Sequence, residues 1–111
     1  MVLAIVGPTF IVTANCGDSK AIVIGKDGSV LMETVDHKPD RPDERQRIEV
    51  QYKARVKRQI DLVKGAASVD AHDNTPYRVW AKDLDMPGLA MSRSIGDAMA
   101  KSLGVIADPE I

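Results

Sequence analysis

The chain has 111 residues, of which 44% are hydrophobic and 28% charged, a composition typical of a globular protein with a packed core. The formal net charge is −1. This balance excludes the strongly basic composition by which whole domains bind nucleic acid or an anionic membrane, so we expect neither as a partner. The single cysteine, Cys16, excludes an internal disulfide. It is typical of a reducing compartment, and we expect a cytoplasmic or nuclear location.

The first sixteen residues, MVLAIVGPTFIVTANC, are strongly apolar. They lack a positively charged start and are interrupted by Gly7 and Pro8. They are also shorter than the roughly 18 to 20 residues that span a bilayer. We therefore expect two strands, at residues 2–6 and 10–14, in place of a targeting segment.

Two more strands are expected at residues 20–25 and 29–35. The turn between them contains Asp27-Gly28, which tolerates the positive φ angles of tight hairpin turns. The first third of the chain thus predicts an antiparallel meander. Because its strands are nearly apolar throughout, we expect both faces to be covered.

An apolar stripe predicts one helix of about 20 residues, from near Pro42 to near Lys64. Its members recur at spacings of four, four, four and three: Ile48, Tyr52, Val56, Ile60 and Val63. Gly65 is typical of a helix end. Residues 41–64 hold eight Lys or Arg against four Asp or Glu. A solvated helix face explains this excess, and a docking surface for an acidic partner is the alternative.

Shorter elements are expected in the remainder of the chain. They are a loop at 66–76, a strand at 77–83 (YRVWAKD), a buried strand at 89–92 (LAMS), a helix at 93–104 that Gly104 closes, and a last strand at 105–111.

The stretch Gly17-Asp18-Ser19 separates two expected strands. An Asp beside Gly can project its carboxylate with little crowding, and Mg²⁺ and Mn²⁺ prefer carboxylate and water oxygens. From spacing alone, an aspartate that bonds its own backbone in a turn explains the same residues. Cys16 is expected to pack as a small hydrophobic residue.

Arg93 lies between two serines in GLAMSRSIGD, residues 88–97. Its planar guanidinium could bind an oxyanion. The structural alternative is an Arg93 paired with a carboxylate and an Asp97 that caps a turn. His37 and His72 show no ligand spacing, and we expect each to be hydrogen-bonded or at the surface.

Five segments occur in a recognisable order: ANCGDSKAIVI, DHKPDRPDERQRIE, YRVW, PGLAMSRSIGD and GVIADPEI. In this order they resemble the metal-dependent protein phosphatases of the PP2C (PPM) family. The resemblance covers nearly the whole chain, from Val2 to Ile111. It is weakest at residues 51–74, where the family usually runs shorter.

The resemblance implies an α+β fold, an antiparallel β-sandwich flanked by helices, of which this chain is a partial, central piece. We expect three parts: a β-meander at 1–36, a helix and flap-like region at 37–86, and the Ser-Arg-x-x-Gly-Asp segment with its following strand at 87–111. Half of such a sandwich exposes apolar faces and open edges, so we expect the isolated chain to be marginally stable or to associate.

The resemblance also implies an activity. Family members hydrolyse phosphoserine and phosphothreonine in phosphoproteins, using water activated by Mn²⁺ or Mg²⁺. Their core metal ligands lie in motifs outside these 111 residues, so we expect no catalytic residue here and no activity of this fragment alone. A non-catalytic pseudophosphatase or an interaction module built on the basic helix 42–64 is the alternative, and a nucleic-acid binder on the same helix is a weaker one.

One metal ligand of the family maps onto the chain. Asp18 matches the Asp of the Gly-Asp-Ser-Arg/Lys motif, which in the family contributes to a third, weaker metal site. The residues expected to support the site without binding metal are Gly17, Ser19, Arg93, Gly96 and Asp97.

Overall fold

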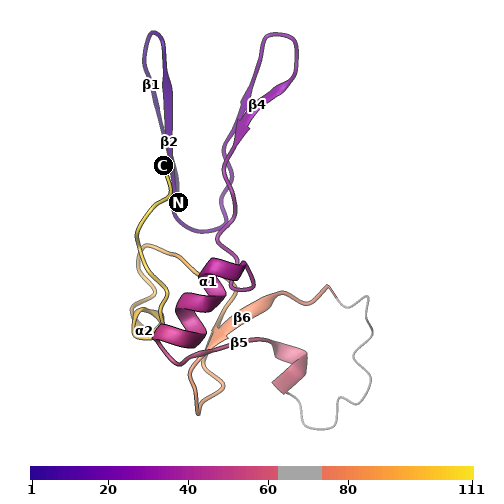
Figure 1. Ribbon diagram of the computed structural model, residues 1–111, viewed down its shortest axis with the longest axis vertical. Coiled ribbons are helices and arrows are strands. Elements are labelled where there is room, and N and C mark those ends of the chain that lie inside the picture. Colours follow the sequence, from indigo (N-terminus) through magenta and orange to yellow (C-terminus); the bar gives the residue numbers. More distant parts are fainter. Residues whose placement is uncertain (63–73) are drawn as a thin grey trace.

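The computed structural model describes residues 1–62 and 74–111. In chain order their elements are β1 (Val2–Val6), β2 (Ile11–Asn15), β3 (Ile22–Ile24), β4 (Val30–Glu33), α1 (Pro42–Gln46), the π-helical turn η1 (Arg47–Gln51), β5 (Arg55–Arg58), the 3₁₀ turn η2 (Gln59–Leu62), β6 (Tyr77–Trp80), β7 (Pro87–Leu89) and α2 (Ala98–Lys101). The shape is elongated, 56 × 31 × 19 Å (Figure 1). Antiparallel sheets and a few short helices confirm the α+β class.

Two separate hairpins form the first third of the chain. β1 pairs with β2, and β3 pairs with β4, both antiparallel. The hairpins extend side by side from one end of the molecule, and residues 16–21 lead from the foot of one to the foot of the other (Figure 1). The four predicted strands are confirmed, but the continuous meander is wrong, because β2 and β3 belong to different sheets.

The hairpins expose large apolar side chains. Leu31 is 67% exposed and Ile24 is 64% exposed, and the other exposed members are Leu3, Ile5, Val6, Phe10, Ile11, Val12, Ile22 and Val30. The expectation that both faces are covered is therefore wrong for this chain by itself. Apolar strands with uncovered faces are typical of a surface on which further protein packs.

The long helix is a wrong prediction. The helix begins at Pro42 as expected, but it ends at Gln51, and Lys53 then adopts a φ of +57° that no helix interior allows. The chain continues as β5, in which Val56 is buried and pairs with Val79 of β6. The four-residue spacing was misleading because a buried strand residue fell in phase with the helical stripe.

The core lies where η1 meets the third sheet, of strand order β5-β6-β7. Its buried apolar residues are Ile48, Ala54, Val56, Val79, Ala100 and Val105. The predicted strand at 77–83 is confirmed as β6, which ends earlier, at Trp80. Val63, Lys64 and His72, and most of the expected loop at 66–76, lie outside the described residues.

The last third has less regular structure than expected. The predicted helix at 93–104 is regular only at Ala98–Lys101, and the chain turns at Gly104 with φ +91°. The buried strand is displaced from 89–92 to Pro87–Leu89. The final strand is wrong, since residues 105–111 form only isolated bridges, Arg93 with Ile106 and Asn15 with Glu110. Among the described residues, no helix has the length and apolarity to cross a membrane.

Candidate functional site

The Gly17-Asp18-Ser19 turn lies between the feet of the two hairpins. Gly17 is buried with φ +113°, and a Cβ at this position would lie 3.3 Å from the carbonyl oxygen of Arg93. Its N–H donates to Nδ1 of His37 at 3.1 Å, and its carbonyl accepts the N–H of His37 at 3.0 Å. Only glycine combines this backbone angle with so close a neighbour, which explains the Gly before Asp18.

Asp18 projects an exposed carboxylate from this turn. Lys38 Nζ donates to its Oδ2 at 2.6 Å, so the carboxylate already holds a cationic group. Ser19 is exposed as well. Within residues 1–62 and 74–111, no three or more His, Cys, Asp or Glu side chains gather as a metal site would require. Asp18 thus fits the role of one metal ligand, but the described residues do not form a complete site around it.

Arg93 binds an anion within the protein. Its Nε and Nη2 both donate to Oε1 of Glu44, at 3.0 and 2.7 Å, and its Nη1 donates to the carbonyl of Asp108 at 2.9 Å. The structural alternative for Arg93 is therefore confirmed. Its guanidinium is only 12% exposed, which leaves little of it for an external oxyanion.

Gly96 and Asp97 shape the start of α2. Both have positive φ angles, +90° and +50°, and the carbonyl of Asp97 accepts the N–H of Ala100 at 2.8 Å. Asp97 occupies the N-cap position, but its side chain makes no capping hydrogen bond, so the expected cap is not formed and only the backbone carbonyl closes the turn. These residues turn the chain from Arg93 into α2.

Glu44 is the buried centre of the ion-pair network. The side chain is fully buried, and Arg47 donates to both of its oxygens, at 2.8 and 2.7 Å. Burial would raise the pKa of Glu44, but the hydrogen bonds from Arg47 and Arg93 outweigh it and hold the pKa far below its usual range. No sequence motif singled out Glu44. The i,i+3 spacing of Glu44 and Arg47 was the available signal.

Glu110 joins the C-terminal segment to the same network. It accepts hydrogen bonds from Arg41 and from Nη2 of Arg93, the latter at 3.2 Å. The hydrogen bond from Arg41 lowers the pKa of Glu110 although burial opposes it. The backbone N–H and C=O of Glu110 also pair with those of Asn15, so β2 and the C-terminal segment meet here.

His37 is fully buried beside this network. Its Nε2 lies 3.4 Å from Oε2 of Glu110, and its carbonyl accepts the N–H of Ser92 at 3.0 Å. Burial and the neighbouring charge of Arg93 lower the pKa of His37, which favours the neutral ring. The expectation of a hydrogen-bonded histidine is confirmed for His37.

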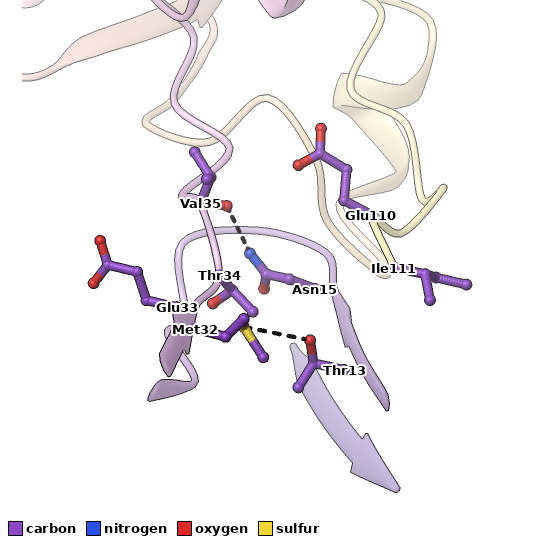
Figure 2. A pocket seen from close by; sticks show the side chains of 8 residues that line it. All are labelled: Thr13, Asn15, Met32, Glu33, Thr34, Val35, Glu110 and Ile111. Carbon is purple, nitrogen blue, oxygen red and sulfur yellow. Dashed lines mark hydrogen bonds between the residues drawn. The ribbon is translucent and has the colours of Figure 1, made fainter. Parts of the chain in front are cut away.

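A hollow of about 240 Å³ lies between the feet of the two hairpins. Figure 2 shows the Asn15 amide directed at the carbonyl of Val35, to which its Nδ2 donates at 2.9 Å. The lining residues are Thr13, Asn15, Met32, Glu33, Thr34, Val35, Glu110 and Ile111. This hydrogen bond from the Asn15 side chain connects the two hairpins. Nearby Cys16 is only 1% exposed, which confirms its packing role.

The basic segment 41–64 is largely neutralised by local acids. Its paired arginines are Arg41 with Asp43 and Glu110, Arg45 with Glu49, Arg47 with Glu44, Arg55 with Asp85, and Arg58 with Asp61. With the helix ended at Gln51, these arginines do not share one helical face. An interaction module on a basic helix 42–64 therefore has no basis in the structure.

The comparisons with known proteins agree with this arrangement. The family model described as Protein phosphatase 2C matches residues 1–111. The chain is 41% identical over 110 residues to "Probable protein phosphatase 2C 8" of Oryza sativa subsp. japonica, covering 99% of this chain and 21% of that protein. It is 39% identical over 116 residues to "Probable protein phosphatase 2C 61" of Arabidopsis thaliana, covering 99% and 31%. It is 38% identical over 112 residues to "Probable protein phosphatase 2C 35" of the same plant, covering 91% and 32%.

The motifs and the family match define the class of protein, a protein phosphatase, and the helices and strands give it an α+β fold. The chain belongs to the protein phosphatase 2C family. It spans about a fifth to a third of the length of these curated relatives.

Proposed function

We propose that the chain is the central part of a PP2C-type catalytic domain and that the protein containing it hydrolyses phosphoserine and phosphothreonine. The family match over residues 1–111 is the observation that carries this proposal. The order of the five motif segments along the chain supports it independently. As in the family, the substrates would be phosphoproteins.

The proposed complete fold is an antiparallel β-sandwich flanked by helices. The uncovered apolar residues of the two hairpins support this proposal, because a second layer of sheet would bury them. The bridge between Asn15 and Glu110 also places the chain end at the edge of β2, where a further strand could pair. The proposed parts remain 1–36, 37–86 and 87–111.

Asp18 is the proposed metal ligand of this chain, for Mn²⁺ or Mg²⁺. Bound metal ions would supply a hydroxide near neutral pH and stabilise the charge of the transition state. The exposed carboxylate on a glycine-containing turn supports the assignment, and this carboxylate already pairs with the ammonium of Lys38 at 2.6 Å. Gly17, whose N–H and carbonyl both bond to His37, would fix the direction in which Asp18 points.

The supporting residues would act without touching metal or substrate. Arg93 anchors its segment to Glu44, while Gly96 and Asp97 turn it into α2. Ser19 continues the exposed turn after Asp18. A cytoplasmic or nuclear location is proposed from the single free cysteine.

Phosphate release from phosphoserine and phosphothreonine peptides by the full-length protein tests the proposal. We expect turnover with Mn²⁺, none with a chelator, and recovery when excess Mn²⁺ is restored. Asp18→Asn should raise the Mn²⁺ concentration that gives half-maximal rate. Absence of turnover at every Mn²⁺ and Mg²⁺ concentration, from a folded protein, would favour a pseudophosphatase.

A further inference from the structure

His37 connects three motif segments that are far apart in sequence. Its N–H and ring Nδ1 bind the carbonyl and N–H of Gly17, both within 3.1 Å. Its carbonyl accepts the N–H of Ser92 at 3.0 Å. Its Nε2 faces the carboxylate of Glu110 at 3.4 Å. The segment before Asp18, the segment before Arg93 and the segment that holds Glu110 thus meet at one residue, through both its backbone and its ring.

The hydrogen bonds around Gly17 determine which ring nitrogen carries the proton. The carbonyl of Gly17 already accepts from the His37 N–H at 3.0 Å and from Asn15 Nδ2 at 3.3 Å. The Gly17 N–H donates to Nδ1 of His37. Nδ1 lies 3.1 Å from both the N–H and the carbonyl oxygen of Gly17. Because that carbonyl already accepts from two other donors, we assign Nδ1 as the acceptor of the Gly17 N–H, which puts the proton of the neutral ring on Nε2, facing Glu110. This tautomer satisfies the buried N–H of Gly17, as a buried donor requires.

We propose that His37 is a positioning residue: by accepting the Gly17 N–H at Nδ1, it sets the Asp18 carboxylate relative to the Ser92-Arg93 segment. The proposal rests on the proposed function for its catalytic consequence. Its structural part, the tautomer and the hydrogen bond, stands without it. The adjacent residue Lys38 contacts Asp18 itself, so residues 37 and 38 hold both members of the Gly17-Asp18 pair.

If His37 only filled space in the core, any apolar side chain of the same volume could replace its ring. The geometry is more specific, because a phenyl or leucine side chain of similar bulk would leave the Gly17 N–H buried without an acceptor. The turn would then relieve this cost by shifting, and Asp18 would move with it. Groups that orient metal ligands typically alter metal affinity by roughly 10-fold to 100-fold when they are removed.

Two variants of the full-length protein separate these roles. His37→Asn keeps an oxygen acceptor near the position of Nδ1, whereas His37→Leu has nearly the same shape as Asn and no acceptor. Both lose the ring and Nε2, so their difference isolates the hydrogen bond to Gly17. Mn²⁺ binding is measured by calorimetry, and phosphopeptide turnover is measured as a function of Mn²⁺ concentration.

We expect His37→Leu to weaken the Asp18-dependent Mn²⁺ site by roughly 10-fold or more and His37→Asn to restore most of it. Equal Mn²⁺ affinities for the two variants would overturn the proposal. In the unmodified protein, nitrogen NMR of the His37 ring should show a bare Nδ1 and a protonated Nε2. A protonated Nδ1 would overturn the proposal even if both variants failed to fold. Failure of the phosphatase function itself would appear differently, as a lack of turnover in the unmodified protein with the NMR result intact.

Discussion

Arg93 donates two hydrogen bonds to the fully buried carboxylate of Glu44, at 3.0 and 2.7 Å, although 49 residues separate them. Arg47 donates to both oxygens of the same carboxylate. A buried carboxylate between two guanidinium groups is stable only while all three are present, because each charge compensates the burial of the others. This cluster therefore anchors the Arg93 segment to α1.

Replacing the carboxylate of Glu44 should strongly reduce the stability of the fold. Glu44→Gln leaves Arg47 and Arg93 with no buried anion, and we expect it to lower the free energy of unfolding by about 3 to 5 kcal/mol. Urea unfolding of the full-length protein measures the change. The control is Asp85→Asn, which removes an ion pair with Arg55 from an aspartate that is 65% exposed and should cost below about 1 kcal/mol. Similar losses of unfolding free energy for the two variants would show that the burial of Glu44 does not determine its contribution to stability.

Gly17 should resist substitution more strongly than Gly28. Both have positive φ angles, but a Cβ at Gly17 meets the Arg93 carbonyl at 3.3 Å, while nothing lies within 4 Å at Gly28. We expect Gly28→Ala to cost about 1 kcal/mol for the backbone angle alone and Gly17→Ala distinctly more. Thermal unfolding of the two variants side by side checks this order, and the reverse order would contradict the described turn.

Stability should fall as the pH is lowered from 7. In the folded protein the pKa of His37 lies below its ordinary value of 6.5. As the pH falls below 6.5, His37 therefore binds a proton in the unfolded chain before it does so in the folded protein. The pKa of Glu44 is likewise depressed below its ordinary 4.5, which adds a further loss below that pH. Each contribution is present above the ordinary pKa and is lost as the pH falls toward the folded pKa. Unfolding midpoints measured from pH 7.5 to pH 4 test the direction.

The charged groups around His37 determine how much of this pH dependence the residue should carry, and replacing His37 is the control. Glu110 and Glu44 favour the charged ring, whereas burial and Arg93 oppose it, and the latter two prevail. His37→Asn should therefore remove the part of the loss that begins near pH 6.5 and keep the part that begins near pH 4.5. An unchanged profile would mean that His37 does not carry it.

The 111-residue chain alone should associate and should not turn over phosphopeptide. Its hairpins expose Leu3, Ile5 and Leu31, and these uncovered faces favour self-association. Sedimentation at several concentrations measures the association. The double variant Leu3→Lys/Ile5→Lys, which charges one face of β1, should reduce it. A compact, concentration-independent monomer with robust Mn²⁺-dependent turnover would contradict the partial-domain account.

The sequence predicted the hairpins well because their signals are local. Alternating turns and apolar runs placed β1 to β4, and the Asp27-Gly28 turn was recognisable from its chemistry. The pairing between the hairpins could not be predicted in the same way. It depends on where residues 16–21 lead the chain, and this is determined by contacts with residues far away in sequence, such as His37.

The prediction of a helix from Pro42 to Lys64 was wrong for a physical reason that the spacing of apolar residues cannot reveal. Ile48 and Val56 are both buried, but on different elements, and the break at Lys53 requires a positive φ at a residue that rarely adopts one. Tertiary packing against Val79 decides the strand. Of the candidate site, Asp18 and Arg93 were identified from motif order, whereas Glu44, Glu110 and the role of His37 emerge only from contacts across the fold.

Metal-dependent hydrolysis with Asp18 as a ligand is the central claim. It is tested most directly by a Mn²⁺ titration of phosphothreonine-peptide turnover by the full-length protein and its Asp18→Asn variant. We predict that the unmodified protein turns over the peptide and that the variant requires at least about 10-fold more Mn²⁺ for half-maximal rate. Identical Mn²⁺ dependence of the two active proteins would contradict the assignment of Asp18, and a folded unmodified protein without turnover would contradict the enzyme.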